Sequence, residues 1–96
     1  MYRVKTGQRL AARRLGVAIR PSTVKGKKLD VYKNGIQVAS IGDIQYGDYW
    51  TYVQDEKYNR APKGTAAQRR RLYKVRNANE CAAKGTVGFF ACRILW

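Results

Sequence analysis

Lysine and arginine are the side chains in this sequence best suited to bind a partner. Twenty Lys and Arg stand against six Asp and Glu, giving a formal net charge of +14. An excess of this size predicts contact with a polyanion, for which nucleic acid, an acidic protein surface and an anionic membrane are all candidates. The predicted contact residues are Arg9, Arg13, Arg14, Lys25, Lys27, Lys28, Arg69, Arg70, Arg71, Lys74 and Arg76.

Catalytic chemistry has little support in the sequence. The chain has no histidine, the usual proton shuttle at neutral pH. The acids that cluster in the middle of the chain match no known carboxylate site: Asp43, Asp48, Asp55 and Glu56. We interpret them as solvated turn residues. The segment VKGKK lacks the remaining residues of a phosphate-binding loop and is interpreted as a basic turn. We therefore expect no enzymatic activity, no cofactor and no small-molecule substrate.

Cys81 and Cys92 are the two cysteines of the chain. Two cysteines are too few for a disulfide framework, and without histidine they are too few for a structural zinc site. For each we expect a small, buried, apolar side chain and no metal.

The length and charge pattern predict one small domain with a basic arm. Ninety-six residues are enough for one modest hydrophobic core. Residues 1–28 hold nine basic side chains and no acidic one, whereas residues 29–56 hold five of the six acids. We predict a basic N-terminal arm over residues 1–14 and a single α+β domain over residues 15–96. No apolar run approaches the roughly 18 residues of a transmembrane helix, and no secretory signal is expected.

A β-hairpin is the clearest structural signal. Asn34-Gly35 lies between two alternating runs, which is typical of a type I′ turn. A two-residue loop would pair Lys33 with Ile36 and Val31 with Val38. The apolar residues that would then share one buried face are Leu29, Val31, Ile36 and Val38. A short strand at residues 15–20, stopped by Pro21, is expected to add a third strand.

A basic helix is predicted from about Ala66 to Ala83. Thr65 and Gln68 match a capping box at its start, and Gly85 follows its end. The apolar stripe at helical spacing consists of Leu72, Val75, Ala78 or Asn79, and Ala82.

The apolar segment KGTVGFFACRILW can form either a strand or a short helix. A helix is favoured because Thr86 is a suitable cap, and in both cases Phe90 and Ile94 would be buried.

Four aromatic rings follow the hairpin within seven residues: Tyr46, Tyr49, Trp50 and Tyr52. Rings among positive charges can stack on single-stranded bases. The segment is acidic, however, so we expect these rings to cover one side of the sheet.

The order of these segments resembles a family of small basic proteins of large double-stranded DNA viruses, among the chlorella-virus, marseillevirus and mimivirus relatives. The resemblance covers roughly residues 17–96. Its matching elements are Pro21-Ser22, Lys28 to Tyr32, Ser40 to Asp43, Tyr46, Asp48-Tyr49, Tyr73, Arg76, Gly85-Thr86, Phe90 and Leu95-Trp96. The chain departs from the family at Asn77, where histidine is frequent, and at Val87, where proline is common.

The resemblance implies a structural minor capsid protein, located in the virion and produced in the infected host cell. Its partners would be the major capsid protein and other minor capsid proteins, bound through basic surfaces. The alternative is a virion protein that binds and neutralises packaged DNA. A capsid role predicts an ordered N-terminal arm, and a DNA role predicts an arm that orders only on DNA.

Overall fold

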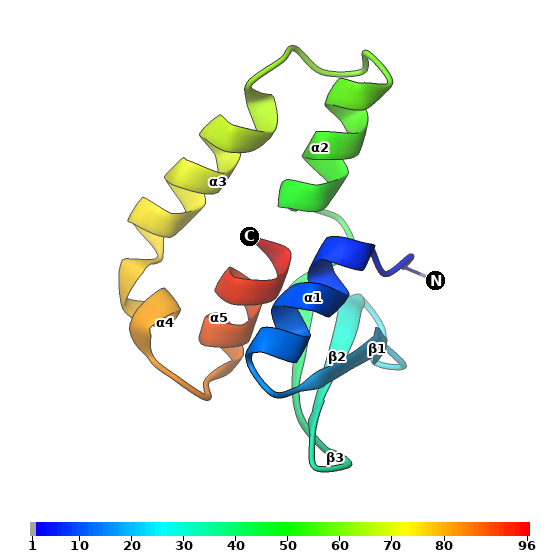
Figure 1. Ribbon diagram of the computed structural model, residues 1–96, viewed down its shortest axis with the longest axis vertical. Coiled ribbons are helices and arrows are strands. Elements are labelled where there is room, and N and C mark those ends of the chain that lie inside the picture. Colours follow the sequence, from blue (N-terminus) through cyan, green and yellow to red (C-terminus); the bar gives the residue numbers. More distant parts are fainter. Residues whose placement is uncertain (1) are drawn as a thin grey trace.

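A three-stranded antiparallel sheet forms the centre of the fold, which a computed structural model describes for residues 2–96 (Figure 1). The strands are adjacent in chain order: β1 (Ala18–Pro21), β2 (Lys27–Lys33) and β3 (Ile36–Asp43). The helices are α1 (Thr6–Arg14), α2 (Tyr49–Lys57), α3 (Thr65–Arg76), α4 (Ala78–Ala82) and α5 (Val87–Phe90), and α5 continues into the π-helical turn η1 (Ala91–Leu95). The predicted α+β class and the third strand are confirmed.

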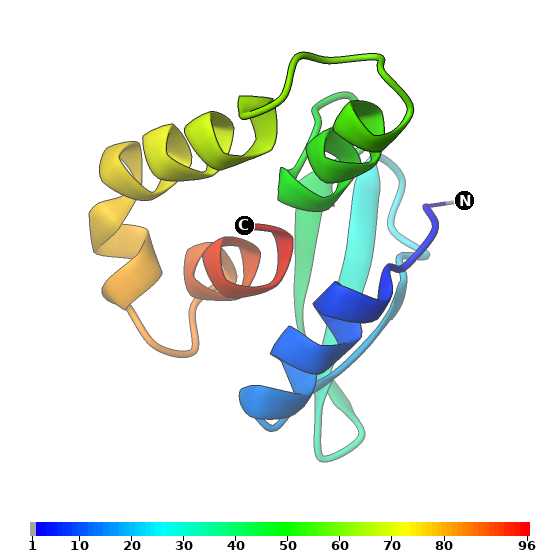
Figure 2. The ribbon, with the colours of Figure 1, turned by 45° about the horizontal axis from the view of Figure 1, so that its top comes forward.

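The hydrophobic core lies between the sheet and two helical segments, α1 and α5–η1. Its buried members are Ala12, Ile19, Leu29, Val31, Ala39, Ile41, Phe89, Phe90, Ile94 and Leu95. Figure 2 shows α1 and the C-terminal segment lying against the sheet. The N-terminal segment, expected as an arm, therefore contributes a helix that packs on the sheet, with Gln8 and Ala12 fully buried.

The hairpin turn forms as predicted, but the residues that the hairpin buries differ from the predicted ones. Asn34 and Gly35 have φ of 53° and 80°, as a type I′ turn requires, and Lys33 pairs with Ile36. A register shift between Val31 and Tyr32 then pairs Val31 with Ala39 instead of Val38.

This register shift corrects two predicted core residues. One extra residue in a strand moves the following side chains to the opposite face of the sheet. As a result Ala39 and Ile41 are buried, whereas Ile36 and Val38 are 68% and 42% exposed.

The predicted basic helix is two helices with a break at Asn77. Its predicted apolar stripe is wrong: Leu72 is 45% exposed and Val75 is 74% exposed. The remaining members are also exposed: Ala78, Asn79 and Ala82. The physical reason is that α3 packs on α2 and not on the sheet, so no core surface faces the stripe.

The start of α3 is stabilised by Glu56 of α2 and not by the predicted capping box. The Glu56 carboxylate accepts hydrogen bonds from the amide N–H of Gly64, at 2.8 Å, and of Ala66, at 2.7 Å. Thr65 instead donates its hydroxyl to the carbonyl oxygen of Pro62. Between the two helices, residues 58–64 form a largely exposed loop at the end of the molecule farthest from the hairpin turn (Figure 1).

The C-terminal segment is helical, as favoured, with Phe90 and Ile94 buried. The Thr86 hydroxyl accepts a hydrogen bond from the amide N–H of Phe89, which confirms the predicted cap. Cys92 of η1 is buried, as predicted, whereas Cys81 of α4 is half-buried. The two cysteines form a disulfide, which the sequence did not predict. The break after α3 turns α4 back against the C-terminal segment and brings the two cysteines together.

Candidate functional site

The carboxylates of this chain are largely used by the fold itself. Asp48, expected to be solvated, is 1% exposed and pairs with Lys28 at 2.9 Å. The same carboxylate accepts hydrogen bonds from the Tyr2 hydroxyl, at 2.6 Å, and from the amide N–H of Thr51, at 2.9 Å. Lys28, a predicted partner contact, is 3% exposed and is therefore an internal side chain. Burial and the nearby Asp48 both raise the pKa of Tyr2, which keeps its hydroxyl protonated as the donor.

Asp30 of β2 is a second buried carboxylate. The hydroxyls of Ser22 and Ser40 donate to it at 2.5 and 2.7 Å, and the amide N–H of Thr23 donates at 3.2 Å. Burial acts to raise the pKa of Asp30, but these hydrogen bonds outweigh burial and hold it below its usual value. With Glu56 bound to the start of α3, three of the six acids are therefore occupied inside the structure.

The other three acids, Asp43, Asp55 and Glu80, are at turns or on the surface, and Glu80 is exposed on α4. Asp43 accepts from the amide N–H of Gln45, as expected for a turn residue. Asp55 lies 3.8 Å from Arg60, and this pair and Lys28–Asp48 are the side-chain ion pairs formed within residues 2–96. The remaining basic side chains on the surface are thus not neutralised by the chain's own acids.

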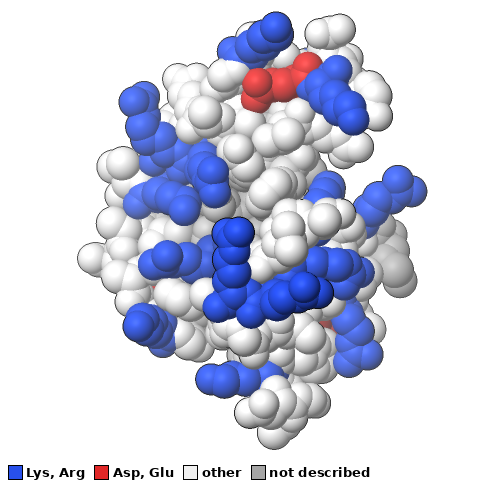
Figure 3. Space-filling view, in the orientation of Figure 1, with Lys and Arg blue, Asp and Glu red and all other residues white. Residues whose placement is uncertain are grey.

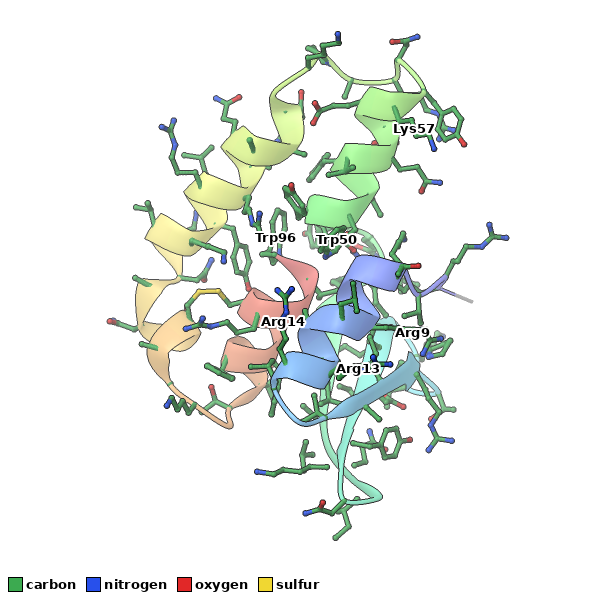
Figure 4. All side chains as sticks on the ribbon, viewed as in Figure 1. Arg9, Arg13, Arg14, Trp50, Lys57 and Trp96 are labelled. Atoms are coloured by element: carbon green, nitrogen blue, oxygen red, sulfur yellow. A yellow bond between two sulfur atoms is a disulfide. The ribbon has the colours of Figure 1, made fainter. Side chains whose placement is uncertain are left out.

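Three predicted contact residues, Arg9, Arg13 and Arg14, are exposed on α1. Figure 3 shows Lys and Arg spread over the face that carries α1, with acidic atoms visible mainly near the connection from α2 to α3. Residues four apart share one side of a helix, and Arg9 and Arg13 do line the same groove, as expected. Figure 4 places all three on the exposed side of α1.

A second group of predicted contact residues lies on α3. Arg69, Arg71 and Arg76 are exposed. Arg70 is half-buried, donates to the main-chain oxygen of Trp96 at 2.6 Å and stacks on Tyr49 at 4.2 Å, so it holds the structure together.

Lys74 is also half-buried on α3. Burial, together with the positive charges of Arg70 and Arg93, lowers the pKa of Lys74. Burial is the largest cause of this shift, and the two neighbouring guanidinium groups add to it. A third, smaller group of predicted contact residues consists of two exposed lysines, Lys25 in the connection from β1 to β2 and Lys27 at the start of β2.

The aromatic rings after the hairpin do not cover the sheet in the way predicted. Tyr49, Trp50 and Tyr52 lie on α2, and Trp50 donates its indole N–H to the carbonyl oxygen of Ile94 at 3.0 Å. Trp96 stacks on Tyr73 with ring centroids 4.6 Å apart. These rings join α2 and α3 to the C-terminal segment.

A cavity of about 450 Å³ lies between α3, the C-terminal segment and the loop after β3. Its walls include Tyr52, Tyr73 and Trp96, and its basic side chains are Arg69, Arg76 and the buried Lys28. Because Trp96 and Tyr73 already stack on each other, they do not form an open platform for bases.

Arg20 is a surface residue that the sequence did not single out. It lies on β1 next to Arg9 and Arg13, and its guanidinium lies over the Tyr32 ring. The alternation of strand residues could have placed Arg20 on the exposed face, but its proximity to α1 depends on the tertiary fold.

Comparisons of the chain with protein-family models, with curated proteins and with solved structures found no match. Within the described part of the chain, no helix is both long and apolar enough to cross a membrane. Within the same residues, no three His, Cys, Asp or Glu side chains lie close enough to hold a metal ion.

Proposed function

We propose that this chain is a structural minor capsid protein of a large icosahedral DNA virus, which binds acidic surfaces of neighbouring capsid proteins. One observation carries the proposal: two of the six acids, Asp30 and Asp48, are buried in the fold, while α1 and α3 present exposed arginines that form no ion pair within the described residues. Such a surface is complementary to an acidic one. The viral setting rests on the resemblance described for residues 17–96.

The ordered N-terminal helix favours the capsid role over charge neutralisation of DNA. Gln8 and Ala12 of α1 are buried, so Arg9 and Arg13 project from a fixed support. A fixed guanidinium matches the forked geometry of a carboxylate and loses less entropy on binding than a mobile one. Neutralising DNA by net charge needs no such support.

The disulfide adds support for a place in the particle. Disulfides persist in oxidising surroundings, including the surfaces of virions, and are rare in the reducing cytosol. The bond between Cys81 and Cys92 joins α4 to the C-terminal segment and so helps to hold α3, which directly precedes α4 and carries the second arginine group.

The second candidate is a DNA-binding virion protein. It is favoured by the run from Arg69 to Arg76 on α3, which contains no acid. This role predicts sequence-independent binding, which for six to ten phosphate contacts weakens roughly 10³- to 10⁵-fold between about 50 and 200 mM salt.

Incorporation into particles tests the proposal. We would compare an Arg69→Ala/Arg71→Ala variant with a Lys63→Ala/Lys84→Ala control, which removes the same charge from exposed positions outside the predicted contacts. Arg70 is kept because it binds Trp96. The capsid role predicts that the arginine variant folds normally but enters particles about tenfold less than the control does. Normal incorporation combined with lost DNA binding at physiological salt would contradict it and support the second candidate.

A further inference from the structure

A groove of about 660 Å³ runs between the last turns of α1, strand β1 and the hairpin turn. Three arginines line it: Arg9 and Arg13 from α1, and Arg20 from β1. As far as residues 2–96 are concerned, its lining contains no aspartate or glutamate. The groove is therefore a concave site of one charge sign, which concentrates the attraction for an anionic group.

The arginines are supported by the groove's own walls. The Arg20 guanidinium lies 4.3 Å from the centroid of the Tyr32 ring, a cation–π contact that fixes its plane. Arg9 donates one N–H to the carbonyl oxygen of Ile19 at 3.5 Å. Each guanidinium has five N–H donors, so both keep donors for a ligand. Because their positions are already restricted, binding costs less side-chain entropy.

The rest of the lining includes an apolar surface, which Val17, half-buried, and Ala18, exposed, offer to a ligand. The site thus combines three cationic groups with a surface that favours a hydrocarbon side chain. A protein segment with acids on both sides of an apolar residue offers both features. The sugar–phosphate backbone of a nucleic acid offers no apolar side chain, and Arg20 already covers a face of Tyr32 that a base would need for stacking.

We infer that this groove binds an acidic segment of a neighbouring protein, in which Asp or Glu residues flank an apolar side chain. The inference rests on the proposed function, because it assigns one of the partner contacts of the capsid role to a defined site. The carboxylates pair with Arg9, Arg13 and Arg20, and the apolar side chain lies against Val17 and Ala18.

The probe is the peptide acetyl-Glu-Glu-Leu-Glu-Glu-amide, titrated into the isotope-labelled chain by NMR at physiological salt. We expect the largest shifts at the amides of Ala12, Val17 and Ala18. An Arg13→Gln/Arg20→Gln variant should bind about tenfold or more weakly, because two charge-assisted hydrogen-bonding groups are lost. The matched control, Lys63→Gln/Lys84→Gln, removes the same charge from exposed positions outside the predicted contacts and should lose less than about threefold. Serine in place of the peptide's leucine should weaken binding several-fold.

Two results would overturn the site. Equal weakening in both double variants, at unchanged thermal midpoint, would mean that net charge alone attracts the peptide. Displacement of the peptide by a single-stranded oligonucleotide that shifts the same amides would assign the groove to nucleic acid.

The site and the capsid role can fail separately. If the Arg13→Gln/Arg20→Gln variant enters particles at the wild-type level, the groove is not the partner site and the capsid role stands. If the wild-type chain is absent from capsid shells while the peptide still binds in the groove, the capsid role fails and the site stands.

Discussion

The two halves of the molecule are held together by different forces. The sheet half, made of α1, the three strands and α5–η1, contains every member of the hydrophobic core. The helical arch, made of α2, α3 and α4, has Ala66 as its one buried side chain among the described residues. The sheet half is thus stabilised by apolar burial, whereas the arch needs specific contacts to stay in place.

Those contacts are few and of different kinds. Trp96 stacks on Tyr73, Arg70 donates to the main chain of Trp96, and Glu56 caps α3. The disulfide fixes the far end of the arch to η1.

The two halves should differ most in how much stability each loses when one of its leucines is replaced by alanine. Leu29→Ala removes a fully buried side chain from the sheet and should lower the free energy of unfolding by about 2–5 kcal/mol. Leu72→Ala on α3 removes one that is 45% exposed and should cost less than about 1 kcal/mol. Urea unfolding of both variants measures the difference. Equal losses would mean that the arch has a core of its own.

Loss of the disulfide should act mainly on the arch. The bond closes a loop with a sequence separation of 11, for which the expected stabilisation is roughly 3 kcal/mol. A Cys81→Ser/Cys92→Ser variant should show faster amide hydrogen exchange in α3 and α4, while β2 and β3 stay protected. Uniform acceleration through the sheet would contradict the separation into two halves.

Asp30 should make the sheet half sensitive to acid. Its folded-state pKa is below that of the unfolded chain, so its contribution is present above about pH 4 and is lost as the pH falls through the folded-state pKa. Asp30→Asn should cost about 2 kcal/mol near neutral pH, because charge-assisted hydrogen bonds are lost. The difference between variant and wild type should shrink in urea titrations at pH values below about 4. A difference that stays constant down to about pH 2 would show that the Asp30 charge is not responsible.

The smallest effect is expected at the cap of α3. Glu56→Gln keeps one acceptor oxygen but loses the second and the charge, so the loss should be about 1 kcal/mol. Asp55→Asn is the matched control, since it removes a neighbouring charge from a loose pair at 3.8 Å. Thermal unfolding followed by helical circular dichroism compares the two. An equal shift would mean that Glu56 acts through its charge alone.

Local chemistry predicted the parts of this structure that depend on few neighbouring residues. Asn34-Gly35 specifies its turn through its own backbone preferences, and Thr86 specifies a cap within three residues. The shift after Val31 lies within a strand whose residues carry no signal for it. Because of this shift, Ala39 and Ile41 are buried in place of Ile36 and Val38.

The candidate surface was predicted less completely, because long-range pairs decide which charges remain free. Lys28 and Asp48 are 20 residues apart and neutralise each other inside the fold. Arg20 joins the α1 arginines only because β1 passes beside that helix. No pattern among residues that are close in the sequence predicts such long-range contacts.

The exposed loop at residues 58–64 is a suitable place to insert a label into the chain. It lies at the end of the molecule opposite the hairpin turn, and its side chains are largely exposed (Figure 1). Chain breaks and insertions are best tolerated at such positions. A short epitope or fluorophore-binding tag placed after Arg60 would precede Gly64, whose amide N–H binds Glu56, and would leave the α1 groove unobstructed. Light or electron microscopy of the tagged chain would then test the proposed location in particles while the arginines of α1 stay accessible.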